Sequence, residues 1–86
     1  MTAIALFGAG GKMGYRLASN FKGSRFHVRH VEVAPPGQAR LKTGLGLDCV
    51  SPDAALDGAD VVILAVPDTH IGKVAAGIDE IGRAHV

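Results

Sequence analysis

The sequence lacks a charge excess of either sign, a second cysteine and a long apolar run, and each absence excludes a class of protein. Nine lysines and arginines oppose eight aspartates and glutamates, so the net charge of +1 indicates neither a nucleic-acid partner nor an anionic membrane surface. Cys49 is alone, which excludes an internal disulfide and favours a reducing compartment. No segment reaches the roughly 18 apolar residues of a membrane span, and no basic region of a signal peptide is present. We therefore expect a cytoplasmic protein without a membrane segment.

Length limits the architecture to one small unit. At 86 residues the chain is shorter than a usual domain, and a chain of this size buries only about 60% of the surface that it exposes when unfolded. Hydrophobic residues make up 48% of the sequence and charged residues 20%, which is typical of a globular protein. We therefore expect a single domain of marginal stability.

Segments with the pattern of a buried strand alternate with segments that have the period of a helix. The expected strands are residues 3–7, 27–34, 46–50 and 61–67. The expected helices are residues 12–21, 38–43 and 52–58, followed by one that begins near residue 70. Pro35 and Pro36 are expected to close the second strand. Because parallel neighbours are joined by crossover helices and not by tight turns, this order predicts an α/β fold with a doubly wound parallel sheet.

A glycine-rich segment, LFGAGGKMG, links the first expected strand to the first expected helix. Its four glycines are Gly8, Gly10, Gly11 and Gly14. In this setting the first glycine permits a tight turn, the next lets the backbone approach a pyrophosphate, and the last lets the helix pack closely on the sheet. The N–H groups at the start of the helix then face the phosphates, and Lys12 adds a positive charge. We expect a dinucleotide site formed by this loop with Lys12 and Met13.

The same glycines have a plainer interpretation, in which they only make a tight turn between a strand and a helix. The apolar strand before them and the amphipathic helix after them favour cofactor binding. A larger residue at Gly10 is expected to intrude on the pyrophosphate and on backbone torsions that require glycine. A phosphate loop of nucleoside triphosphatases is disfavoured, because no Gly-Lys-Ser/Thr follows at the required spacing.

A second marker of a dinucleotide site is an acidic residue about 20 residues past the loop, at the end of the second strand. Glu32 lies 18 residues past Gly14. Its carboxylate would accept from the two adenosine ribose hydroxyls and repel a 2′-phosphate, so the sequence slightly favours NAD over NADP. The alternative is an exposed carboxylate paired with Arg29 or Arg40. Either arginine also keeps NADP open, since it would reach a 2′-phosphate if Glu32 turned away.

The strongest expected strand, residues 61–67, ends at the same sheet edge as the glycine loop. Its last residues and the next one, Val66, Pro67 and Asp68, are therefore expected to border the cofactor. Three segments resemble the N-terminal Rossmann domain of the 6-phosphogluconate dehydrogenase and hydroxyacid dehydrogenase superfamily. They are IALFGAGGKMG, VEVA and DGADVVILAVPDTHIGKVAAGI, the last of which contains this strand. Within it the likeness is greatest to the D-apionate oxidoisomerase group, often labelled phosphogluconate dehydrogenase-like, over residues 3–78.

The resemblance implies an NAD(P)-dependent oxidoreductase that acts on a sugar acid or a related hydroxy acid. It implies a partial sheet with strand order 3-2-1-4, in which the remaining strands and the substrate domain are missing. The catalytic residues would then lie downstream and are unknown, so the chain alone is expected to be inactive. The parent enzyme is expected to be a homo-oligomer that binds a dinucleotide and a small-molecule substrate.

Two other functions stay open on the sequence. The glycine loop alone also resembles that of dihydrodipicolinate reductase, which likewise carries a basic residue, methionine and glycine after its glycines. A non-catalytic module that senses NAD(H) or another nucleotide would use the same loop. A longer sequence separates these functions, because a downstream helical domain with lysine, histidine or asparagine at the nicotinamide supports the enzyme.

The remaining chemistry-bearing residues predict no further site. His27 and His30 are spaced i, i+3 on a strand and so point to opposite faces, which does not suit a shared metal ion. His70 follows the last expected strand and is expected to face solvent, with contact to the substrate or nicotinamide as the alternative. Cys49 is expected to be a small buried residue, because no base is identifiable near it. The sequence therefore predicts neither a metal site nor a nucleophile.

The last residues generate a prediction about the source gene. Glu80–Val86 can be reverse-translated as GAG ATC GGA AGA GCA CAC GTC, which from its second base is the start of a common short-read sequencing adapter. We therefore expect residues 1–80 to be an incomplete N-terminal dinucleotide-binding domain, and residues 81–86 to be adapter read-through and not native. Sequencing the source gene checks this expectation. Other synonymous codons in this stretch would contradict it.

Overall fold

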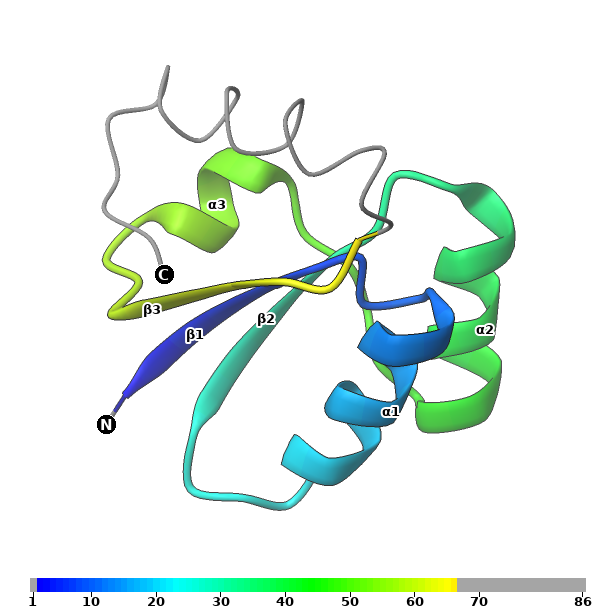
Figure 1. Cartoon of the computed structure of the whole chain (residues 1–86), viewed down its shortest axis with the longest axis horizontal. Helices are drawn as coiled ribbons and strands as arrows, with labels where there is room; N and C mark the ends of the chain where they lie inside the picture. The colour runs from blue at the N-terminus through cyan, green and yellow to red at the C-terminus, as the bar shows by residue number, and fades with distance from the viewer. Residues whose placement is uncertain (1, 67–86) are drawn as a thin grey trace.

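Three parallel strands form the sheet in the computed structural model, which describes residues 2–66. The central strand is β1 (Ala3–Phe7), with β2 (His27–Val31) on one side and β3 (Val61–Leu64) on the other (Figure 1). The helices are α1 (Lys12–Phe21), α2 (Pro35–Leu45) and α3 (Pro52–Leu56). The predicted α/β fold with a parallel sheet is confirmed. Among these helices none has the length and apolarity needed to cross a membrane.

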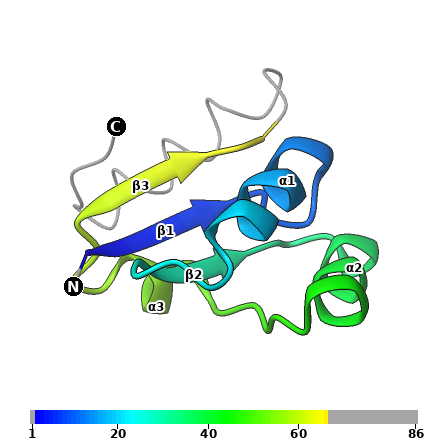
Figure 2. The same ribbon diagram turned by 90° about the horizontal axis from the view of Figure 1, so that it is seen from below.

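Helices cover both faces of the sheet, because alternate residues of β1 point to opposite sides. Leu6 packs in one cluster with Ala18 of α1 and Leu41 of α2. Phe7 packs in a second cluster with Leu56 of α3. Figure 1 shows α1 and α2 on one side of the strands and α3 on the other, and Figure 2 shows the strands side by side in the order β2-β1-β3. All of β1 is buried, as expected for a central parallel strand.

The strand predicted at residues 46–50 is reduced to a single parallel bridge between Cys49 and His30. The bridge lies on the outer side of β2. This agrees with the predicted order 3-2-1-4, in which residues 46–50 were the third strand and the strand now labelled β3 was the fourth. The residues on either side of the bridge, Gly46 and Ser51, serve as helix caps. Gly46 takes a left-handed conformation after α2, at φ 67°, and the Ser51 side chain accepts from the backbone N–H of Ala54 at the start of α3. Four residues, 47–50, lie between the caps, and Cys49 is the one that bridges to β2.

The prediction that two prolines close the second strand is wrong. Pro35 and Pro36 instead form the first turn of α2, which runs over eleven residues and not only over the predicted 38–43. Proline suits this position because its missing N–H has no partner in the first turn of a helix and its fixed φ is already helical. The strand β2 therefore ends at Val31, earlier than predicted. β3 likewise ends at Leu64, and α1 has the predicted bounds.

The packing of α1 on the sheet depends on Gly14. A Cβ placed on this residue would overlap the Gly8 carbonyl oxygen and would lie 2.8 Å from the Ala9 Cα. Both obstacles are backbone atoms, so no side-chain movement relieves the overlap. The last glycine of the loop thus permits close packing, and the surface that α1 approaches at Gly14 is the backbone of the loop and not, as predicted, the sheet.

We expect Gly14→Ala to destabilise the chain by about 1–3 kcal/mol through overpacking, although alanine is the better helix former by about 1 kcal/mol. Gly44→Ala is the matched control in α2, because the first atom its Cβ would meet is the hydroxyl at the far end of the Tyr15 side chain. Urea unfolding of the full chain, followed by circular dichroism, measures both changes. Equal free energies of unfolding for the two variants would contradict the packing argument.

Candidate functional site

The three strand ends bring together segments that are far apart in the sequence. After β1, the Gly8 N–H donates to the Val31 carbonyl at the end of β2 (2.9 Å). After β3, the Ala65 N–H donates to the Phe7 carbonyl at the end of β1 (2.9 Å). The glycine loop, Glu32 and Val66 therefore meet at one edge of the sheet (Figure 1). This edge, at the carboxyl ends of parallel strands, is where open α/β sheets place their ligands.

The first loop glycine is required by both conformation and space. Gly8 has φ +78°, in the left-handed region that side chains rarely adopt. A Cβ placed there would overlap the Ala65 carbonyl oxygen and would lie 2.9 Å from a methyl carbon of Val66. Gly8 therefore sets both the turn after β1 and the distance between that turn and the end of β3.

Gly10 is required for a packing reason that the sequence did not reveal. Its φ is not positive, so the predicted torsional requirement is wrong. A Cβ on Gly10 would instead overlap the Gly37 carbonyl oxygen and would lie 2.6 Å from the Gly37 Cα, in the first turn of α2. Gly11 has an ordinary φ of −77°, and a Cβ placed on it would lie 3.4 Å from the Gly8 carbonyl oxygen. Sequence reasoning missed Gly37, although a glycine directly after two prolines at a helix start was a signal.

The backbone N–H groups of the loop are already bound within the chain. Those of Gly8 and Ala9 donate to the Val31 carbonyl, and that of Gly11 donates to the Gly8 carbonyl (3.0 Å). The Gly10 N–H donates to Glu32 Oε1 (3.0 Å). α1 begins at Lys12, and its N-cap residue, Gly11, has no side chain to bind the free N–H groups of the first turn. The donors left for a ligand are therefore the N–H groups of residues 12–14. They lie at the positive end of the helix dipole and suit an anion.

A cavity of about 380 Å³ opens beside these donors. Its lining consists of Gly11, Lys12, Met13, Arg16, Ala65 and Val66. The structure thus places the predicted residues Lys12, Met13 and Val66 around one hollow, with Met13 65% exposed. Arg16 was not predicted, yet its spacing of four from Lys12 puts both cations on one face of α1. The chemistry of this hollow suits an anionic ligand with an apolar part.

Glu32 connects the end of β2 to both the loop and the approach to α2. Besides the Gly10 N–H, its carboxylate accepts from the Ala34 N–H through Oε2 (3.1 Å). Its backbone carbonyl accepts from the Gln38 side chain (2.6 Å). Each carboxylate oxygen has a second lone pair, so the residue can still accept from hydroxyl groups of a ligand.

Neither arginine of the predicted alternative forms an ion pair with Glu32 within residues 2–66. Arg29 lies over the other face of the sheet and donates to the backbone carbonyls of Ala55 (3.0 Å) and Asp57. Arg40, in α2, donates from Nη1 to the Gly10 carbonyl (2.6 Å). Arg29 is therefore engaged at the end of α3, away from the loop, whereas Arg40 belongs to the site.

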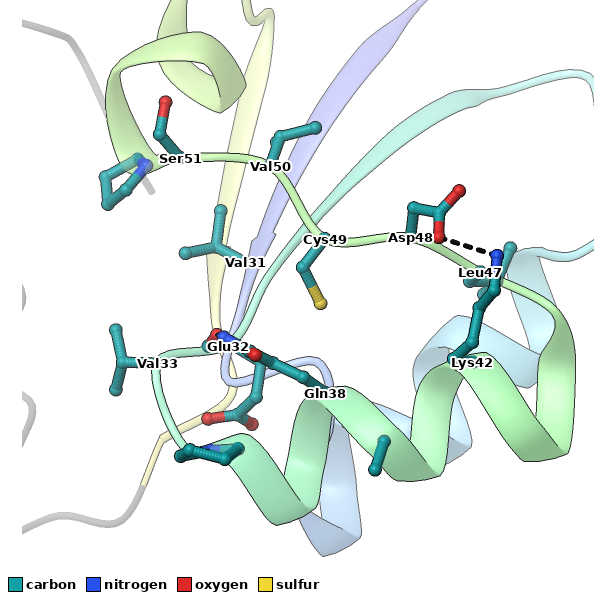
Figure 3. Close-up of a pocket in the computed structure, with 13 residues that line it drawn as sticks. Val31, Glu32, Val33, Gln38, Lys42, Leu47, Asp48, Cys49, Val50 and Ser51 are labelled. Atoms are coloured by element: carbon teal, nitrogen blue, oxygen red, sulfur yellow. Dashed lines mark hydrogen bonds and ion pairs between the residues drawn. The ribbon is translucent and has the colours of Figure 1, made fainter.

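A larger cavity of about 800 Å³ lies on the outer side of Glu32, between α2 and the segment 47–52. Figure 3 shows the Cys49 sulfur pointing into it and the Lys42–Asp48 ion pair (2.9 Å) at its rim. Burial, followed by the carboxylates of Glu32 and Asp48, raises the pKa of the Cys49 thiol, and a backbone hydrogen bond with Glu32 opposes this shift less strongly. The thiol is therefore poorly suited to act as a nucleophile.

The histidines of β2 do not meet. His27 is exposed at the start of the strand, whereas His30 is buried and its burial lowers the pKa of the imidazole. Within residues 2–66 no group of three side chains is placed to hold a metal ion. Pro67, Asp68 and His70, three further residues considered for the site, lie outside the described residues.

The comparisons with known proteins agree with this geometry. Residues 3–86 match the family described as NADP oxidoreductase, coenzyme F420-dependent. The chain belongs to this family. It is also similar to two D-apionate oxidoisomerases, with 77% identity over 78 residues to that of Rhizobium rhizogenes and 68% over 75 residues to that of Cupriavidus necator. These matches cover 91% and 87% of this chain, and the predicted resemblance to the D-apionate oxidoisomerase group is confirmed.

A solved structure supports the fold independently of the sequence pattern. It is a semialdehyde dehydrogenase NAD-binding protein from Cupriavidus necator in complex with calcium and NAD, with a TM-score of 0.91 and 63% identity over 94% of this chain. The match covers 29% of that protein, and the curated relatives are covered to 28% and 27%. The chain therefore spans little more than a quarter of the length of the proteins it matches.

The surroundings of Cys49 generate a prediction about pH. Because burial and the two nearby carboxylates disfavour the thiolate, we expect alkylation of folded Cys49 by iodoacetamide to reach half its maximal rate at a higher pH than in the unfolded chain. The rate is measured against pH in buffer and in concentrated urea, and Cys49 is the single cysteine of the chain. Coincident profiles would show that the thiol does not lie in this environment.

Proposed function

We propose that this chain is the NAD(P)-binding part of an oxidoreductase. The observation that carries the proposal is the convergence of the glycine loop, the uncapped start of α1 and Glu32 at the carboxyl ends of three parallel strands. The family match and the relative solved with NAD support it. With the similarity to D-apionate oxidoisomerases, they favour an enzyme of that kind over a nucleotide-sensing module and over a dihydrodipicolinate reductase.

The phosphates of the dinucleotide would lie at the start of α1. The N–H groups of Lys12, Met13 and Gly14 would donate to them, because the earlier N–H groups of the loop are already bound within the chain. The Lys12 and Arg16 side chains would add positive charge at the rim of the same cavity. Val66, with Pro67 and Asp68 after it, would border the dinucleotide from the side of β3.

The adenosine ribose would lie against Glu32. The second lone pairs of its carboxylate would accept from the two ribose hydroxyls, and its negative charge would repel a 2′-phosphate. We therefore assign NAD as the preferred cofactor. The glycines Gly8, Gly10, Gly11 and Gly14 complete the proposed set of cofactor-binding residues.

The chemistry follows from the cofactor and from the relatives. A nicotinamide dinucleotide supplies a hydride acceptor or donor, and D-apionate, which names the curated relatives, is a sugar acid. We therefore propose a sugar acid or a related hydroxy acid as the substrate of a longer, cytoplasmic and homo-oligomeric enzyme. Its catalytic residues and substrate domain would belong to the part that this chain does not contain, which would leave the chain alone inactive.

We expect the full-length enzyme to prefer NAD, and substitution of Glu32 to narrow or invert the preference. One charge-assisted hydrogen bond contributes about 1.5–3 kcal/mol, which corresponds to roughly ten- to hundredfold in affinity. Glu32→Gln retains an oxygen that can accept from the Gly10 N–H, and it removes the charge together with the acceptor for the Ala34 N–H. Glu32→Ser also removes the contact with the loop, so it should in addition weaken the binding of both cofactors.

Steady-state kinetics with both cofactors check this expectation. The ratio of kcat/KM for NAD to that for NADP is compared in the unmodified enzyme, Glu32→Gln and Glu32→Ser. An unmodified enzyme that already favours NADP, or an unchanged ratio in Glu32→Gln, would remove Glu32 from the ribose site.

A further inference from the structure

Both polar backbone atoms of Gly10 are held by charged side chains from outside the loop. Its N–H donates to Glu32 Oε1 (3.0 Å) and its carbonyl oxygen accepts from Arg40 Nη1 (2.6 Å). Both hydrogen bonds are part-buried, and the Gly10 Cα lies against the backbone of Gly37. The residue at the centre of the loop is therefore fixed on three sides, by β2, by the side chain of Arg40 and by the first turn of α2.

The bond from Arg40 has an electrostatic consequence for an anionic ligand. A carbonyl oxygen carries the negative end of the peptide dipole, so a free Gly10 carbonyl near the start of α1 would repel a phosphate. Arg40 binds this oxygen in a charge-assisted hydrogen bond, which is stronger than one between neutral groups. It also places a positive charge on the same residue that Glu32 approaches with a negative one.

An arginine that binds the 2′-phosphate of NADP would need a different arrangement. If Arg40 turned to such a phosphate, the Gly10 carbonyl would lose this donor in a part-buried place, which is unfavourable. The phosphate would also approach the Glu32 carboxylate, because both side chains bind the same residue. These two penalties set Arg40 apart from an arginine that is free to recognise NADP.

We propose that Arg40 is a positioning residue for the dinucleotide, which acts through the Gly10 carbonyl and does not read the 2′-phosphate. The proposal rests on the proposed function of the chain. Arg40 should therefore affect the binding of NAD and of NADP equally, because the loop that Arg40 holds faces the pyrophosphate that both cofactors share.

The test compares Arg40→Met, Arg40→Lys and the control Lys42→Met in the full-length protein. Lys42 lies two residues further along α2 in an exposed ion pair with Asp48, so its substitution removes the same charge with little structural effect. Fluorescence titration gives Kd for NADH and NADPH, and hydrogen exchange of the peptide covering residues 8–14 reports on the loop without a ligand.

For Arg40→Met we expect both Kd values to rise by the same factor, about tenfold, together with faster exchange in residues 8–14. Arg40→Lys should recover part of the affinity, since its ammonium can donate to the Gly10 carbonyl, and Lys42→Met should match the unmodified protein. A rise confined to NADPH would overturn the proposal in favour of phosphate recognition. Unchanged Kd values with a lower melting temperature would overturn it in favour of a merely structural role.

The titration of the unmodified protein separates this inference from the proposed function. If that protein binds neither dinucleotide, the proposed function is wrong and the cofactor role of Arg40 is wrong with it. If it binds NADH and Arg40→Met binds equally well, only the inference is wrong.

Discussion

A loop with few side chains has to be held by its backbone, and in this protein the end of β2 holds it. The Val31 carbonyl accepts from two successive N–H groups of the loop, and Glu32 accepts from the next one. These three bonds use up the first donors of the loop, so the donors left at the sheet edge are those at the start of α1. If the end of β2 moved, the turn would lose its shape and α1 would no longer point at the edge where β3 ends.

The elements that the sequence predicted best are those whose pattern is local. β1 is a run of apolar residues ended by Gly8, and α1 repeats Met13, Leu17 and Phe21 at spacings of four, so a strand and a helix follow without knowledge of the rest. The prolines at 35–36 were misinterpreted because proline ends a strand and begins a helix equally well. A single bridge at Cys49 stands where a strand was predicted, and the capping roles of Gly46 and Ser51 depend on where the flanking helices end.

The sequence predicted where the site lies, but not which contacts form it. Glycines after a first strand and an acid after the second indicate the same sheet edge, and the structure brings Gly10 and Glu32 together there. The reason for Gly10 was out of reach, because it lies in the backbone of Gly37, 27 residues later in the sequence. The different places of the two arginines could not be predicted either, since they depend on the carbonyl groups that the fold brings near Arg29 and Arg40.

The contact between Gly10 and Gly37 makes the first turn of α2 and the glycine loop one inherited block. A relative with a bulkier residue at position 10 would need a different distance between helix and loop, because a Cβ there would overlap the Gly37 backbone, whereas a Cβ on Gly37 would meet the Glu32 side chain. A recombination point placed between the two would join a loop shaped for one helix to a helix shaped for another. Segment exchange among related oxidoreductases, whether by evolution or in the laboratory, should therefore succeed when residues 8–40 travel together and fail when they are divided.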